Sequence, residues 1–408
     1  MRYVVAAFIS GLALGCGGDD FTSNPGAGGA GGIGGGAAAS GGSAGAPAGG
    51  TAGVAGAGGG ASGSGAGGAG GASGCKIVDV GCVGIFAGSI GQTGSVDGVG
   101  AAARFDELSQ LASTNTTLWV GGGDACVREI DVNTATVKTV AGVCKQPGGA
   151  DGVGAAARFG SIAGAVTNGQ KLWLSDSGNG TIRELDLGSY AVTTLAGVAG
   201  QKSTVDGFGS TARLQEPRWL TLHAGSLFVA DSMAHVVRRI DVLNKEVTTL
   251  AGIVGQSGSM DGNGAIARFD GPRAVHGVNA GVLVADTENS RVRLLVPGKD
   301  AAASVVSTFA GSTSGFADGP FGIAKLDRLR GMASDGATVY VADTDNDTVR
   351  KLEAGQVTLL AGSPGAPHGV GLYGAAGIVR PRDVHYHAQT SSLFIVESGT
   401  VIRRMRLK

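Results

Sequence analysis

The sequence predicts an all-β fold, a six-bladed β-propeller built from four-stranded antiparallel blades. An Ala-Gly pair closes an apolar run at six places that lie 51 to 59 residues apart, and such a period is the signature of a repeat architecture. A loop and short β-branched runs without a helical period follow each pair. The pairs stand at 87–88, 141–142, 196–197, 251–252, 310–311 and 361–362.

The third repeat shows the elements of one blade most clearly. Its strand-like runs occupy 217–222, 227–230, 236–240 and 247–251. Gly and Asp residues separate the runs, as they do in antiparallel sheets joined by tight turns. Six copies of this unit, none of which can bury its apolar face alone, predict six sheets arranged around one axis.

The two ends of the repeating region are predicted to share one blade. The region opens at 84–87 with Gly-Ile-Phe-Ala, which matches a fourth strand, and ends at 401–405 with Val-Ile-Arg-Arg-Met, which matches a third strand. We therefore expect the N-terminal strand to complete the last blade, so that no sheet edge stays open where the ring closes.

An Asp-Gly loop follows five of the Ala-Gly pairs, and a basic residue stands seven positions after each Asp. Taken alone, one such loop resembles a phosphate-binding loop, but its recurrence between β-strands favours a structural role. We expect Asp261 to cap its loop and Arg268 to pair with it or with a carbonyl. Similar structural pairs are expected for Asp231 with Arg238, Asp286 with Arg293 and Asp343 with Arg350.

Three segments carry a resemblance to a known family. The runs 229–238, 284–293 and 341–350 each lead from Val-Ala-Asp to Val-Arg, and they resemble NHL repeats. The resemblance extends over 83–408 and implies the same six-bladed propeller. The first copy departs from the pattern with Gly-Gly-Gly at 121–123, and the last departs with Val-Glu at 396–397.

Residues 1–15 have the pattern of a secretory signal peptide. One basic residue, Arg2, precedes an uncharged apolar run that is too short to span a bilayer. The run 12–16, Leu-Ala-Leu-Gly-Cys, resembles a bacterial lipobox, which implies that Cys16 is the lipidated first residue of a lipoprotein. Gly17 favours, by the same resemblance, the outer membrane or cell surface as the destination. Ordinary secretion with an incidental thiol is the alternative.

Residues 16–74 connect this cysteine to the repeats. Gly supplies 27 of the 58 residues at 17–74, and Asp19 and Asp20 are the only charged ones. Such a composition cannot form an apolar core, so we expect a disordered Gly/Ala/Ser-rich linker with a root-mean-square span of roughly 40 Å. The propeller is then expected at 75–408.

The four remaining cysteines fit an oxidising compartment. Cys126 and Cys144 flank an expected hairpin turn near Ala135, while Cys75 and Cys82 lie close together in the sequence. We predict the disulfides Cys75–Cys82 and Cys126–Cys144. A metal site is the alternative, although the chain has no CxxC motif.

Arginines at the start of the innermost strands are candidates for ligand binding. In blades three to six the second aligned position is arginine, whereas the first two blades have Ser109 and Ala163 there. We expect the arginines to gather at the channel mouth on the face of the long loops, where they would attract carboxylates, sulfates or acidic protein segments. Local pairing of each arginine with an acidic loop residue is the alternative. The four residues are Arg218, Arg273, Arg330 and Arg382.

Histidines are also concentrated on the innermost strands. His223, His276 and His385 lie at even offsets from the strand start, and so on one side of their strands. They could bind Zn²⁺, as histidines do in the peptide-amidating lyase that shares this propeller fold, or have structural and hydrogen-bonding roles. The run 343–347, with Asp at every second position, resembles a fragment of a calcium loop. Apart from these two ions, no cofactor is expected.

Charge and loop length favour a binding function. Lys and Arg total 31 against 32 Asp and Glu, so nucleic acid is not an expected partner. The loops before the innermost strands are uniform, at 18 to 20 residues, which builds a broad flat face. The sequence therefore favours a monomeric, non-catalytic binding scaffold for a protein, peptide or glycan, anchored to the cell envelope through its lipid. A metal-dependent lyase or hydrolase using the inner-strand histidines is the alternative.

Overall fold

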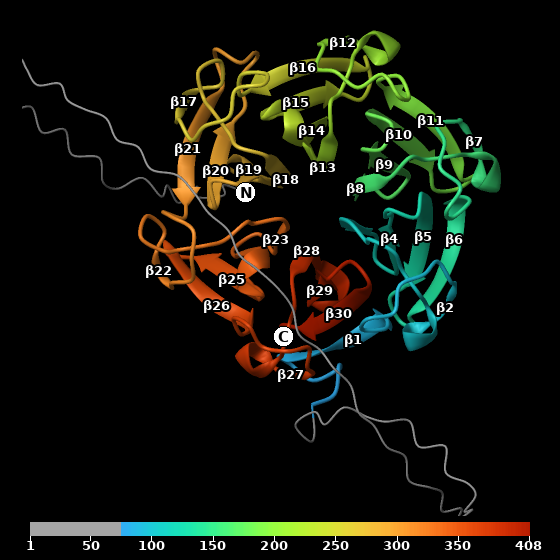
Figure 1. The fold of residues 1–408 in the computed structure, drawn as a ribbon, viewed down its shortest axis with the longest axis vertical. Helices are drawn as coiled ribbons and strands as arrows, with labels where there is room; N and C mark the ends of the chain where they lie inside the picture. The colour runs from blue at the N-terminus through green and yellow to red at the C-terminus, as the bar shows by residue number, and fades with distance from the viewer. Residues whose placement is uncertain (1–74) are drawn as a thin grey trace, which may run out of the picture. The chain divides into compact units, whose positions relative to one another are not determined.

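The computed structural model describes residues 75–408, which form six antiparallel sheets arranged in a ring (Figure 1). The predicted signal peptide at 1–15, the lipidated Cys16 and the linker up to residue 74 lie outside the described residues. Between 75 and 408 the chain has no α-helix and seven short 3-10 helices, so the predicted all-β propeller is confirmed. In that part of the chain we find no helix with the length and apolarity needed to cross a membrane.

Every blade has the same strand order, from the channel to the outer edge of the ring. Blades 1 to 6 follow the chain. In that order the innermost strands are β3 (Leu111–Ser113), β8 (Ile162–Thr167), β13 (Pro217–His223), β18 (Pro272–Val278), β23 (Met332–Ser334) and β28 (Pro381–His387). The second strands are β4 (Thr117–Val120), β9 (Lys171–Asp176), β14 (Ser226–Asp231), β19 (Gly281–Asp286), β24 (Val339–Asp343) and β29 (Ser392–Glu397). The third strands are β5 (Cys126–Asp131), β10 (Thr181–Asp186), β15 (Val236–Asp241), β20 (Arg291–Val296), β25 (Thr348–Glu353) and β30 (Val401–Arg406).

The outer strands complete the blades. The fourth strands are β6 (Thr136–Gly142), β11 (Ala191–Ala196), β16 (Glu246–Ala251), β21 (Val305–Ala310), β26 (Gln356–Gly362) and β1 (Cys82–Gly88). The fifth are β2 (Gly98–Val99), β7 (Gly152–Val153), β12 (Gly207–Phe208), β17 (Gly262–Asn263), β22 (Gly319–Pro320) and β27 (Gly371–Leu372). The 3-10 helices are η1 (Gly100–Ala102), η2 (Gly154–Ala156), η3 (Gly209–Thr211), η4 (Ser232–Ala234), η5 (Thr344–Asn346), η6 (Tyr373–Ala375) and η7 (Ala388–Thr390).

The four main strands of blade 3 agree with the prediction within one residue at either end. The fifth strand was not predicted. In blade 3, Gly207 of β12 pairs with Val247 of β16, and Phe208 pairs with Glu246. Each fifth strand lies in the glycine-rich loop that follows an Ala-Gly pair. Two paired residues are too few to give the alternating pattern of a strand, which is why the sequence predicts only loop at this place.

The ring closes as predicted, because the N-terminal strand completes blade 6. β1 lies between β27 and β30 (Figure 1), and it pairs with β30 through Val83 opposite Met405 and Ile85 opposite Arg403. The first and last strands of the described region therefore belong to one sheet, and the junction leaves no open main-chain edge.

Both predicted disulfides are present. Cys126 and Cys144 are bonded across the β5–β6 hairpin, with their Cα atoms 4.9 Å apart. Ala135 forms the hairpin turn with a φ of 56°. The Cys75–Cys82 bond joins the start of the described region to β1.

A buried arginine on the third strand holds each blade together. In blade 4, Arg293 donates to Asp286 at the end of β19 over 2.8 Å, and it also pairs with Asp261 in the Asp-Gly loop. The guanidinium lies 5.4 Å from the centre of the Phe269 ring and is fully buried. The expected Asp286–Arg293 pair is thus confirmed. The equivalent buried arginines are Arg128, Arg183, Arg238, Arg350 and Arg403.

One of the two alternatives predicted for Arg268, pairing with Asp261, is wrong. Asp261 pairs with Arg293 rather than with Arg268, whose guanidinium donates to the carbonyls of Ile266 and Ala267. The carbonyl alternative for Arg268 is therefore confirmed. Asp261 also accepts the main-chain N–H of Thr308 on the fourth strand, so this one carboxylate links the loop to two strands.

Candidate functional site

Four predicted arginines border one pocket at the start of the innermost strands. The six aligned positions, from blade 1 to blade 6, are Ser109, Ala163, Arg218, Arg273, Arg330 and Arg382, and all six line a pocket of about 90 Å³. They meet because each residue lies at or just before the start of the innermost strand of its blade, and the six innermost strands surround one channel. We call this pocket, with its four arginines, the arginine mouth.

Three of these four guanidinium groups have no acceptor among the residues that the structure describes. Arg218 Nη2 donates to Glu216 Oε1 over 2.6 Å, so local pairing holds for this arginine. Among residues 75–408, the side chains of Arg273, Arg330 and Arg382 make no hydrogen bond or ion pair. The Nε atoms of Arg218, Arg273 and Arg330 are buried without an acceptor. Buried donors in folded proteins are usually paired, so the guanidinium groups of Arg273, Arg330 and Arg382 keep hydrogen-bonding capacity that no described residue uses.

The arginine mouth carries an excess of positive charge in partly buried surroundings. Burial lowers the pKa of Arg330 to about 10, and the neighbouring charges of Arg273 and Arg382 lower it further. The pKa of Arg273 is also lowered, by burial first and then by the charge of Arg218. The lowered pKa values reflect electrostatic repulsion between these cations. An anion between them would relieve this repulsion.

The nearby carboxylates do not neutralise the arginine mouth. Glu288 and Asp345 lie on the rim and pair with Arg328, at 2.7 and 3.7 Å, and Asp345 also contacts Arg380. Among the described residues Glu107 is the only carboxylate that lines the pocket itself, while Glu216 pairs with Arg218 beside it. Four arginines thus face one acid in the lining.

Trp219 lines the arginine mouth beside the arginines, and it does not line the cavity further along the channel. It comes from β13, yet its Cη2 atom lies only 2.7 Å from where a Cβ on Gly331 of blade 5 would be. Any larger residue at 331 would therefore collide with the indole. Trp219 was not predicted as a site residue. The one feature of the sequence that could have indicated its role is that no other blade has an aromatic residue at the position after the aligned arginine.

Polar side chains connect the innermost strands behind the tryptophan. Gln110 donates to the Leu220 carbonyl over 3.0 Å and accepts the N–H groups of Ala165 and Leu220. Asp383 accepts the Leu111 N–H over 2.7 Å. These bonds satisfy main-chain groups at the inner edge of the sheets, which would otherwise lack partners.

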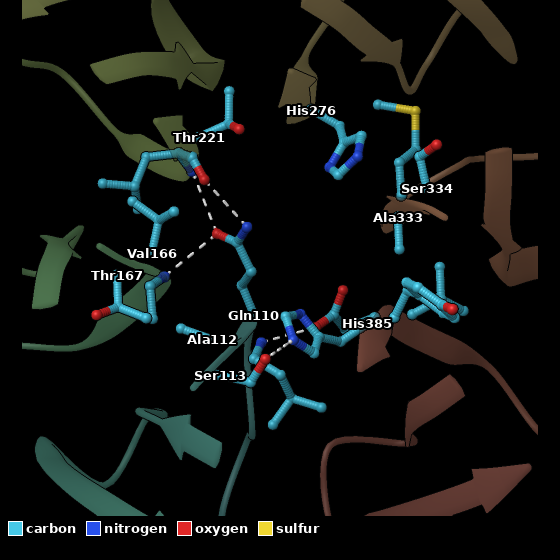
Figure 2. A pocket seen from close by; sticks show the side chains of 17 residues that line it. Gln110, Ala112, Ser113, Val166, Thr167, Thr221, His276, Ala333, Ser334 and His385 are labelled. Carbon is cyan, nitrogen blue, oxygen red and sulfur yellow. Dashed lines mark hydrogen bonds between the residues drawn. The ribbon is translucent and has the colours of Figure 1, made fainter. Parts of the chain in front are cut away.

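A second cavity of about 140 Å³ follows further along the channel (Figure 2). We call it the channel cavity, and it shares no lining residue with the arginine mouth. His385 Nε2 and Ser113 Oγ lie 2.7 Å apart at its wall, and the His276 ring faces it from blade 4 (Figure 2). The main polar residues of its lining are Gln110, Ser113, Thr221, His276, Ser334, Asp383 and His385.

The structure brings together two of the three histidines suggested as metal ligands. His276 and His385 line the channel cavity, but His223 does not; its ring packs edge-on against Phe228 at 6.1 Å. In the described part of the chain, the only three potential ligands whose atoms lie within 4.8 Å of one another are Asp124, Cys126 and Cys144. Two of these are joined in a disulfide. The three imidazoles therefore do not converge on one point.

The suggested calcium ligands at 343–347 are engaged with the protein. Asp343 binds Arg350 and Asn346. Asp345 contacts Arg380, and Asp347 accepts the main-chain N–H of that residue. The three carboxylates thus contact different partners rather than surrounding a common point.

The two histidines and the aspartate that line the channel cavity are uncharged near neutral pH. Burial lowers the pKa of His276 to about 4, with a smaller effect from His223. Burial likewise lowers the pKa of His385 to about 3, with smaller effects from His387 and His276. Burial raises the pKa of Asp383 to about 8, so this carboxyl group is protonated at pH 7.

Replacing Asp383 with asparagine is expected to stabilise the protein increasingly as the pH rises from 5 to 8. The folded state raises the pKa of Asp383 above the unfolded value, so the wild type binds more protons when folded and loses stability as pH rises between about 4 and 8. The size of this loss is about 1.4 kcal/mol per pH unit. Asparagine keeps an acceptor for the Leu111 N–H and removes the titration.

Urea unfolding of both proteins at pH 5, 6, 7 and 8 tests this expectation. The histidines are common to both, so their titration cancels in the difference. A stability difference that stays constant over this pH range would contradict a protonated Asp383.

Comparison with known proteins agrees with the fold. No family model matches the chain. NHL repeat-containing protein 2 from Bos taurus is 33% identical over 163 residues, which cover 36% of this chain and 22% of that protein. The human protein of the same name is 25% identical over 298 residues, covering 64% of this chain and 40% of that protein. The chain therefore spans less than half the length of these relatives.

Two solved structures from Bacteroides thetaiotaomicron share the fold. One is a structural genomics protein of unknown function, with a TM-score of 0.61, 21% identity, and coverage of 79% of this chain and 75% of that one. The other is an auxiliary nutrient binding protein, with a TM-score of 0.59, 15% identity, and coverage of 79% and 76%. Identities this low show the fold alone.

These findings define the class of protein. The chain contains a six-bladed β-propeller, and its homologues include NHL repeat-containing proteins.

Proposed function

We propose that the protein is a binding scaffold of the cell envelope, anchored through Cys16, whose arginine mouth binds an acidic group of a protein, peptide or glycan. The observation that carries the proposal is the convergence of four arginines on one pocket, three of them without an acceptor between residues 75 and 408. The ring supplies a rigid frame for these side chains, and the uniform loops around them supply a broad surface.

The chemistry of the mouth favours an oxyanion. Guanidinium groups match carboxylates and sulfates with two parallel hydrogen bonds, and such charge-assisted bonds are about twice as strong as neutral ones. The pocket, at about 90 Å³, accommodates one acidic group rather than a whole polymer. The remainder of the ligand would then lie over the surrounding loop face.

Export and anchoring are supported by the cysteines and by the lipobox-like sequence. The Cys75–Cys82 and Cys126–Cys144 bonds fit an oxidising compartment. The run 12–16 supplies the cysteine for lipidation. We therefore propose the outer membrane or cell surface as the location, with the linker at 17–74 connecting the lipid to the propeller.

The nutrient-binding neighbour supports the scaffold interpretation at a coarse level only. That protein is described as an auxiliary nutrient binding protein, and it shares the overall fold. The metal-dependent lyase or hydrolase alternative has less support, because His223 lies outside the cavity that His276 and His385 line.

Binding titrations with three probes test the proposal. The purified protein is titrated with oligogalacturonate, hexaglutamate and a neutral dextran oligosaccharide, and metal content is measured on the same sample. We expect binding of at least one acidic probe and none of the neutral one. Failure of both acidic probes, or equal binding of the neutral one, would contradict an anion site. Stoichiometric Zn²⁺ or Ca²⁺ that is lost on His276→Ala and His385→Ala would instead favour the enzyme alternative.

A further inference from the structure

A groove between blades 4 and 5 adjoins the channel cavity. This inter-blade groove has a volume of about 500 Å³ and is lined by Val278, Leu283, Phe309 and Val339, among others. His276 and Ser334 line both spaces. A single ligand could therefore occupy the channel cavity and the groove together.

The junction of the two spaces offers hydrogen-bonding groups. His276 makes no side-chain hydrogen bond to any residue from 75 to 408, and its ring faces the channel cavity (Figure 2). Ser334 Oγ accepts the Gly336 N–H over 3.0 Å, which leaves its own proton to donate. A neutral imidazole has one donor and one acceptor. The junction can thus both give and accept a hydrogen bond.

The inter-blade groove itself is apolar. Leu283 and Val339 are buried parts of the blade core, and Phe309 packs against Phe321 with ring centres 4.9 Å apart. Of the described residues that line the groove, His276 is the only titratable one. An apolar chain or ring would be removed from water here, whereas a charged group would lose its hydration without a partner.

We propose that these two connected spaces form a second binding site, for a small uncharged molecule with a hydrogen-bonding head and an apolar arm. The head, an amide, carbonyl or hydroxyl group, lies beside His276 in the channel cavity, and the arm lies in the inter-blade groove. The channel cavity, at about 140 Å³, is close to the ~150 Å³ that accepts benzene in an engineered protein cavity. This site is separate from the arginine mouth and does not depend on the proposed function.

Neutral surroundings explain the preference for an uncharged ligand. The His276 and His385 rings are unprotonated and the Asp383 carboxyl group is protonated near pH 7, because burial shifts all three pKa values. A carboxylate ligand would find no cation in this lining, so it would bind at the arginine mouth instead.

Ligand-observed NMR with benzamide, benzoate and toluene tests the site. Benzamide carries an uncharged head and an apolar ring, benzoate has the same shape with a charge, and toluene lacks the head. We expect benzamide to bind more tightly than toluene in the channel, and His276→Leu to weaken benzamide about tenfold, the value of one good hydrogen bond. Ser334→Met, which fills the junction, is expected to exclude both. His223→Gln serves as the matched control, since His223 lines neither space.

Three results would overturn the proposal. One is benzamide binding that His276→Leu and Ser334→Met both leave unchanged. Another is benzoate binding in the channel as tightly as benzamide. The third is benzamide binding that is lost on Arg273→Ala, because it would place the probe in the arginine mouth.

Discussion

Replacing Arg293 with methionine is expected to lower the free energy of unfolding by about 3–5 kcal/mol, the usual cost of removing one partner from a buried ion pair. Arg293 is fully buried between Asp286 and Asp261. Methionine fills much of the space but leaves Asp286 without its cation. Burial raises the pKa of Asp286 to about 6 even with Arg293 present, so protonation of this carboxyl group offsets part of the loss.

Urea unfolding at pH 7 measures this change. Arg268→Met is the matched control, because Arg268 donates to local carbonyls and makes no ion pair among the described residues. We expect the control to change stability by less than about 1 kcal/mol. Equal effects of the two substitutions would contradict the role assigned to the Asp–Arg–Asp contact.

Replacing Arg273, Arg330 and Arg382 together with alanine is expected to weaken binding of an acidic ligand at least about 100-fold. A hydrogen bond to a charged group contributes about 1.5–3 kcal/mol, and the loss of two such bonds already corresponds to that factor. The folded protein is not expected to lose stability through charge, because the lowered pKa of Arg330 shows that its cation is disfavoured in the fold.

Two controls separate the arginine mouth from general positive charge. Arg328→Ala and Arg380→Ala remove rim arginines that already contact Asp345, and together they are expected to weaken binding only slightly. Binding by the wild type is expected to fall as salt concentration rises. Unchanged affinity in the triple variant would remove the arginine mouth as the binding site.

The fold was predictable because its signals repeat. The number of blades was predicted from six Ala-Gly pairs and six sets of strand runs. The closure of the ring was predicted from the strand types at 84–87 and 401–405. The sequence left open whether Arg268 pairs with Asp261 or with a carbonyl, and it did not suggest Arg293 as the partner of Asp261. The spacing to the buried arginine carried this information, because 32 residues separate Asp261 from Arg293 and Asp318 from Arg350. Arg268 was considered instead because it lies only seven positions after Asp261.

The candidate sites were predictable only in part. Aligned strand starts place Arg218 and its three counterparts on one rim, because position along a strand fixes height in the channel. Arg273 has no acceptor among the described residues because the rim arginine Arg328 pairs with Glu288 and Asp345 instead. This competition for the carboxylates cannot be predicted from the spacing of residues in the sequence. Trp219 and the channel cavity were missed for a similar reason. The alternation of side chains along a strand predicts which side of the strand a residue faces, but not which side chains surround it there. For this reason His223 was grouped with His276 and His385.

The most direct test of the arginine mouth observes the arginine side chains themselves. The Nε–H resonances of Arg218, Arg273 and Arg330 are followed by NMR, assigned with single Arg→Lys variants, while the protein is titrated with the acidic probe that binds it best. We expect saturable shifts of the Arg273 and Arg330 signals, with the Arg268 signal unchanged. Saturation of the protein with the probe while the Arg273 and Arg330 signals stay in place would contradict this expectation.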